Sequence, residues 1–124
     1  MAFEYTAIGK KSIQEDVTNN ANFGDYTMIL YTARAATPLV LGDLTESIAP
    51  GYAQVEMTGA NWVITVDADY PKVSFVLEGV GSDLLGYAIK RDSTLLGYED
   101  FTDGPYVIPA AGVSVGVTFK QVVA

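Results

Sequence analysis

The sequence predicts an all-β fold, an antiparallel β-sandwich of jelly-roll-like architecture with under about 10% helix. Three observations carry this prediction. Apolar and polar residues alternate along many short stretches, turn-forming residues recur about every ten residues, and no apolar pattern with a helical period exceeds one turn. The 124 residues fit one domain. Short strands in a chain of this length close naturally into two packed sheets, and we expect seven or eight strands, roughly one for each turn interval.

The strands of the predicted body begin at Asp25. Residues 25–32 are rich in β-forming residues and nearly all apolar, which suits a central strand. Residues 33–38 are expected to form a loop, and Asp43 stands where it can cap a single turn. The dipeptide Pro50-Gly51 indicates a turn that leads into an alternating strand over residues 52–58.

The second half of the chain continues this strand-and-turn pattern. Strands are predicted over residues 62–66, 73–78, 85–89, 94–99, 106–108 and 113–120, with a loop over residues 79–83. The phase of the alternation predicts which side chains face inward. That inward set is Ile29, Val55, Met57, Trp62, Ile64, Val73, Phe75, Leu85, Tyr87, Ile89, Val115, Val117 and Phe119.

Residues 1–24 are predicted to form an extended N-terminal arm, ahead of a body that spans residues 25–124. The segment is polar and lacks a periodic apolar face, although Ser12 to Glu15 fits a capping box for one helical turn. We expect the arm to lie on its own body, on a neighbouring subunit or on a larger lattice, and to become ordered on binding. The residues expected to contact the partner are Phe3, Tyr5, Ile8, Lys10, Lys11 and Ile13.

Composition and charge exclude several classes of function. The chain has no cysteine and no histidine, so disulfides, thiolate metal sites and the commonest general base are missing. The net charge is −8, and an acidic protein repels phosphate backbones, so no nucleic-acid partner is expected. No apolar run approaches the roughly 20 residues of a membrane span, and the first residues lack the pattern of a signal peptide. We therefore expect no membrane partner and synthesis in the cytoplasm.

No catalytic centre is recognisable, and the sequence predicts that the protein is not an enzyme. A serine or threonine nucleophile would need a lysine base, and no Ser-x-x-Lys motif is present. Residues 9–12 resemble a phosphate-binding loop only superficially, because the upstream glycine is missing. The carboxylate clusters at residues 67–69 and 99–103 do not follow EF-hand spacing and are interpreted as solvated turns. No cofactor or metal is predicted.

The aromatic residues leave a sugar-binding interpretation open. Exposed rings on a sandwich can stack on carbohydrate, whereas the usual role of a tyrosine is to pack in the core or at its rim with one wet hydroxyl. The tyrosines considered for such a stacking platform are Tyr26, Tyr31, Tyr52, Tyr70, Tyr87, Tyr98 and Tyr106.

Several short motifs follow one another along the chain in an order and at a spacing that can be compared with known proteins. They are Leu30-Tyr31-Thr32, Pro38, residues 43–46, residues 51–53, Trp62, residues 85–89, residues 98–101, residues 104–106 and residues 112–119. Over some three quarters of its length the chain resembles a loose group of small phage structural proteins, among them capsid cement or decoration proteins.

The resemblance implies a function as well as a fold. It implies a virion protein without catalytic residues that binds and stabilises the outer surface of the major capsid protein shell. Closed symmetry is usual for such assemblies, and a homo-oligomer, with a trimer as first choice, is expected. The alternatives are a tail-fibre module and a carbohydrate- or receptor-binding sandwich.

Overall fold

The computed structural model describes residues 3–6, 26–57, 63–64, 68–91, 93–102 and 104–121. Within these residues the regular structure is β, apart from one 3-10 turn, η1 (Leu41–Asp43). The strands are β1 (Glu4–Tyr5), β2 (Tyr26–Arg34), β3 (Leu44–Glu46), β4 (Val55–Met57), β5 (Val63–Ile64), β6 (Ala68–Leu77), β7 (Gly86–Arg91), β8 (Thr94–Asp100) and β9 (Val113–Gln121). The predicted all-β class is confirmed.

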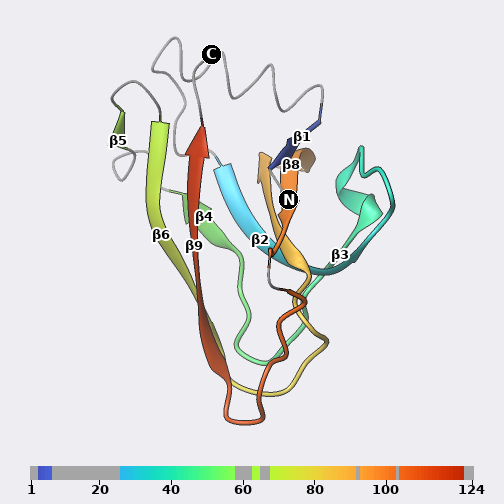
Figure 1. Ribbon diagram of the computed structural model, residues 1–124, viewed down its shortest axis with the longest axis vertical. Coiled ribbons are helices and arrows are strands. Elements are labelled where there is room, and N and C mark those ends of the chain that lie inside the picture. The colour runs from blue at the N-terminus through green and yellow to red at the C-terminus, as the bar shows by residue number, and fades with distance from the viewer. Residues whose placement is uncertain are drawn as a thin grey trace.

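The strands form two antiparallel sheets that face each other (Figure 1). One sheet has the order β1-β8-β7-β2-β3, with β4 also paired to β2, and the other has the order β5-β6-β9. Strands β3 and β4 lie one after the other along the same edge of β2. The β7–β8 hairpin of the larger sheet is nested in sequence between β6 and β9, which pair in the smaller sheet. Nested hairpins of this kind give the sandwich its jelly-roll-like character.

The main core lies between the two sheets. The larger sheet contributes Met28, Leu30 and Ile89, and the smaller sheet contributes Phe75 and Val117. Most of the predicted inward set that the structure describes is confirmed here. The members in or against this core are Val55, Met57, Val73, Phe75, Tyr87, Ile89, Val115 and Val117. Trp62 and the side chains of Ile64 and Phe119 lie outside the described residues.

A second apolar cluster covers the outer face of the larger sheet. It contains Tyr31, Ala88, Leu95 and Tyr98, and Leu44 packs there after the loop that follows β2. Ile29 and Leu85 belong to this cluster, so their predicted place in the inward set is wrong. For Ile29 the reason is the strand period of two: Met28 and Leu30 face the main core, which turns Ile29 outward. Leu85 precedes β7, and its neighbour Leu84 lies in the main core instead. Burial of both faces explains why the central strand β2 is apolar without alternation from Met28 to Tyr31.

Residues 3–6 belong to the sandwich, whereas the sequence predicts an arm up to residue 24. Glu4 and Tyr5 pair with Tyr98 and Gly97 of β8, and the Thr6 amide donates to the Leu96 carbonyl oxygen at 2.9 Å. The sequence allows the arm to lie on its own body, on a neighbouring subunit or on a larger lattice. Residues 3–6 lie on their own body. Residues 7–25 lie outside the described residues.

The predicted strand over residues 106–108 is also corrected. Only an isolated bridge between Leu84 and Tyr106 forms there, with both amide-to-carbonyl hydrogen bonds at 2.8 Å. The proline at 109 ends the segment before a ladder can extend. The turn predicted at Pro50-Gly51 is confirmed, and Gly51 adopts a φ of 82° that favours glycine.

Candidate binding surface

Three loops meet at one end of the sandwich, at the bottom of Figure 1. The Glu78 amide donates to the Pro50 carbonyl oxygen at 2.7 Å, which ties the loop after β3 to the loop after β6. A Cβ on Gly81 would lie 2.7 Å from the Ala49 Cβ and 3.5 Å from Ile108 Cδ1, so the third loop is in close contact as well. These contacts give the loops a fixed mutual arrangement.

Large apolar side chains project from each of these loops. Ile48 is 94% exposed, Val80 is 63% exposed and Val107 is 72% exposed. We call these three residues and the loops that carry them, residues 47–51, 78–83 and 104–112, the apolar loop end. Single exposed apolar residues are common, but three on adjoining loops that are tied together make this end a candidate binding surface.

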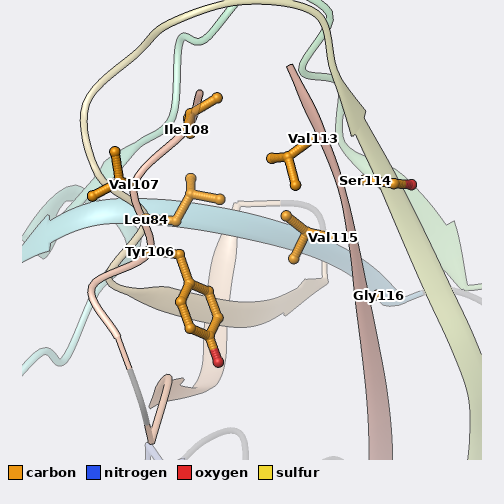
Figure 2. A pocket seen from close by; sticks show the side chains of 8 residues that line it. All are labelled: Leu84, Tyr106, Val107, Ile108, Val113, Ser114, Val115 and Gly116. Atoms are coloured by element: carbon orange, nitrogen blue, oxygen red, sulfur yellow. The ribbon is translucent and has the colours of Figure 1, made fainter. Parts of the chain in front are cut away.

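A groove runs from the loop end along β9. Its first part has a volume of about 360 Å³. Figure 2 shows Leu84, Tyr106, Val107 and Ile108 on one side and the β9 residues Val113 and Val115 on the other, with Ser114 pointing away. Apart from that serine and the hydroxyl of Tyr106, the side chains that line it are apolar.

The second part of the groove, about 290 Å³, is more polar. The Phe101 and Tyr106 rings stack at 4.8 Å between centroids, and Phe101 also lies 6.2 Å from the Tyr87 ring. Glu99 lines the same space, and its Oε1 accepts a 2.7 Å hydrogen bond from Tyr87 Oη. Among the described residues, neither part of the groove is lined by a lysine or an arginine.

Among the described residues, the tyrosines do not come together as a stacking platform for sugar. Tyr26, Tyr31, Tyr87 and Tyr98 are buried and are divided between the two apolar clusters. Tyr52 stacks on Phe75 at 6.0 Å between centroids, and Tyr106 alone is exposed among the described tyrosine side chains. The side chain of Tyr70 lies outside the described residues.

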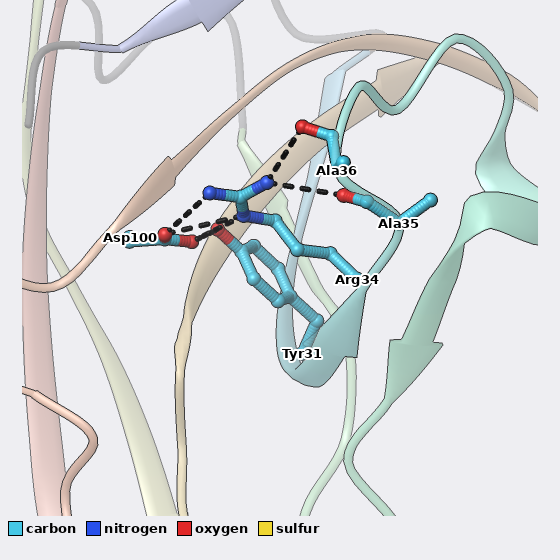
Figure 3. A network of polar contacts seen from close by, with 5 residues as sticks. All are labelled: Tyr31, Arg34, Ala35, Ala36 and Asp100. Atoms are coloured by element: carbon cyan, nitrogen blue, oxygen red, sulfur yellow. Dashed lines mark hydrogen bonds and ion pairs between the residues drawn. The ribbon is translucent and has the colours of Figure 1, made fainter.

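A polar network on the outer face of the larger sheet is structural. Arg34 Nε lies 2.9 Å from Asp100 Oδ1, Arg34 Nη2 lies 2.9 Å from Asp100 Oδ2, and Arg34 Nη1 donates to the carbonyl oxygens of Ala35 and Ala36 (Figure 3). Tyr31 Oη also donates to Asp100. The hydrogen bonds from Arg34 hold the pKa of Asp100 below its usual value, and burial raises that of Tyr31. Because its carboxylate is already engaged, Asp100 is poorly placed to bind a metal or a partner.

A second polar network supports the base of the loop end. Tyr52 Oη donates to Glu46 Oε2 at 2.6 Å and accepts a hydrogen bond from the Leu30 amide at 3.2 Å. Gln54 Nε2 donates to both oxygens of the same carboxylate, at 2.9 and 3.0 Å. These bonds close the loop of residues 47–51 from both sides and hold Ile48 on a rigid base.

The predicted partner-binding residues are not brought together in the described structure. Phe3 packs partly buried against the main core and stacks on Tyr87 at 5.8 Å between centroids, so it contributes to the body. Tyr5 is placed only by its backbone in β1, and Ile8, Lys10, Lys11 and Ile13 lie outside the described residues. The sequence pattern does not predict the apolar loop end. The available signal was the presence of Val80 inside a predicted loop and of Ile48 beside a predicted turn, where polar residues are usual. Val107 carried no such signal, because it lies in the strand predicted over residues 106–108.

The described part of the chain holds no group of three or more acidic side chains that could ligate a metal ion. It also contains no helix with the length and hydropathy of a membrane span. In the comparisons with known proteins, no family model, no curated protein and no solved structure matches this chain.

Proposed function

We propose that the protein is a non-catalytic structural component of a phage virion, a decoration protein that attaches to the outer surface of the major capsid protein shell through its apolar loop end. The observation that carries the proposal is this end itself. Ile48, Val80 and Val107 are held in the open by loops that are bonded to one another. A preorganised apolar surface binds without the entropic cost of ordering its loops, which suits a protein that clamps a shell.

The polar arrangements support a structural role. In the two described networks, the carboxylates of Glu46 and Asp100 accept hydrogen bonds from neighbouring side chains and brace loops and strands. Burial raises the pKa of Tyr31 and Tyr52, so their hydroxyls stay protonated in these networks and are poor nucleophiles. The acidic net charge of −8 favours a location outside the shell, away from packaged DNA. We further propose a homo-oligomer, with a trimer as first choice, because shells offer matching symmetry axes.

Binding to shells that lack the protein tests the proposal. We expect Ile48→Ser and Val107→Ser together to weaken binding at least about tenfold, since two exposed apolar anchors are lost. The matched control is Val76→Ser, because Val76 is 60% exposed on β6 and lies outside the loop end. Density for the protein on the capsid surface of virions supports the proposal. Density on the tail, absence from virions, or equal weakening by the control contradicts it.

A further inference from the structure

Strand β9 presents an edge that is open to pairing. Among the described strands it pairs only with β6, and the smaller sheet ends with it. Its nine residues, Val113 to Gln121, contain no proline and a single charge, Lys120. Natural sheets usually protect exposed edges with prolines, charges, bulges or covering loops. From Val113 to Val117, β9 contains neither a proline nor a charged residue.

The groove leaves room beside this edge. A strand added to β9 would lie about 4.8 Å from it and would place alternate side chains toward each face of the sheet. On the inner side these side chains would meet the apolar wall formed by Leu84, Val107 and Ile108. The groove therefore favours a segment that is extended and apolar at every second position.

The carboxylate of Glu99 favours a positive charge on the added strand. Its Oε1 accepts the Tyr87 hydroxyl, and no lysine or arginine pairs with the carboxylate among the described residues. It lines the groove together with Gly116 and Val117 of β9. A basic side chain on the added strand would supply the missing positive charge in a partly buried, aromatic setting.

We propose that β9 and its groove bind an extended segment of another protein by strand addition, and that this segment is apolar at alternate positions and carries a lysine or arginine beside Glu99. The main-chain hydrogen bonds to β9 give affinity, and the groove gives side-chain specificity. The inference rests on the proposed function only for the source of the segment, which would be the shell protein.

A labelled peptide of sequence Thr-Val-Lys-Val-Thr-Val-Lys-Thr is the probe, with fluorescence anisotropy as the readout. Two peptide controls separate the contributions. The same peptide N-methylated at alternate residues loses backbone donors and should not bind, and a version with Glu in place of Lys should bind at least about fivefold more weakly.

Variants of the protein locate the site. Val113→Lys places a charge in the groove and should weaken binding of the lysine peptide at least about tenfold, whereas Val76→Lys, on β6 and away from the groove, should leave it unchanged. Glu99→Gln keeps an acceptor for Tyr87 and should erase the preference for lysine over glutamate. Circular dichroism confirms that each variant is folded.

The outcomes separate this inference from the proposed function. Equal binding of the N-methylated peptide, no loss with Val113→Lys, or no binding of the lysine peptide at about 1 mM overturns strand addition. None of these results bears on capsid density or on the Ile48 and Val107 variants. Conversely, specific peptide binding by a protein absent from virions would leave the inference standing and remove the proposed function.

Discussion

Tyr31 donates a hydrogen bond to Asp100 across an intervening strand, over the one residue of that strand that has no side chain. In the register of the sheet, Tyr31 of β2 faces Gly86 of β7, and Gly86 faces Asp100 of β8. A Cβ on Gly86 would overlap the Tyr31 hydroxyl and the Glu99 carbonyl oxygen. The glycine thus allows a tyrosine to reach two strands away and to join the Arg34–Asp100 ion pair.

Gly86→Ala is expected to destabilise the protein by about 1 to 3 kcal/mol, the usual cost of overpacking a tight site. Urea unfolding measures the change. Gly42→Ala is the control, because a Cβ at Gly42 meets nothing within 4 Å, and it should stay within about 0.5 kcal/mol of the wild type. Equal stability of the Gly86 variant and the wild type would contradict the close approach.

Acid should weaken the Arg34–Asp100 pair. The hydrogen bonds from Arg34 lower the pKa of Asp100 in the folded state, so the unfolded chain binds the proton more tightly. The stabilisation is complete above the ordinary aspartate pKa of about 3.9 and is lost as the pH falls through the lowered folded value. Asp100→Asn should cost about 1.5 kcal/mol at pH 7, near the lower limit for charged hydrogen bonds because both side chains are 20% exposed. Unfolding curves of the two proteins should converge near pH 2; a constant gap would exclude this linkage.

High pH should destabilise the protein through the ionisation of two tyrosines. Burial, with hydrogen bonds to Asp100 and Glu46, raises the pKa of Tyr31 and Tyr52 above the ordinary value. Their contribution is complete below the unfolded pKa of about 10 and is lost as the pH rises toward the folded values. Stability should therefore fall above about pH 10, and Tyr52→Phe should fall less steeply. Tyrosinate absorbance recorded beside circular dichroism tests this. Ionisation of all eight tyrosines in a folded chain would contradict it.

The sequence predicts the strands well where one pattern dominates. Val73, Phe75, Val115 and Val117 alternate strictly, and all four are buried as expected. The period alone does not reveal which face a wholly apolar strand presents to which neighbour. This is why the pattern predicts Ile29 in the main core, although it packs in the cluster on the outer face.

The candidate surface was harder to foresee because it depends on contacts between distant residues. Ile48, Val80 and Val107 are separated by about thirty residues each along the chain, and the loops that carry them come into contact only in the folded protein. Likewise, two residues of β1 carry too weak a pattern for a strand prediction, and its place beside β8 is set by tertiary pairing. Local sequence propensity predicts neither the contact between these loops nor the pairing of β1 with β8.

The position of Phe3 leads to the last prediction. Its ring stacks on Tyr87 and packs against the main core, and the neighbouring Thr6 is buried with its hydroxyl donating to the Leu95 carbonyl oxygen at 2.8 Å. Phe3→Ala should therefore lower the free energy of unfolding by about 1 to 2 kcal/mol, less than the 3 to 5 kcal/mol of a fully buried phenylalanine because the ring is only partly buried. Removal of residues 1–6 should cost more, since β8 then loses a paired neighbour. Ile48→Ala, at a side chain that is 94% exposed, serves as the control and should leave stability unchanged. Denaturant unfolding of the three variants tests whether residues 3–6 stabilise the body. If these residues served only to bind a partner, all three variants would have the same denaturation midpoint as the wild type.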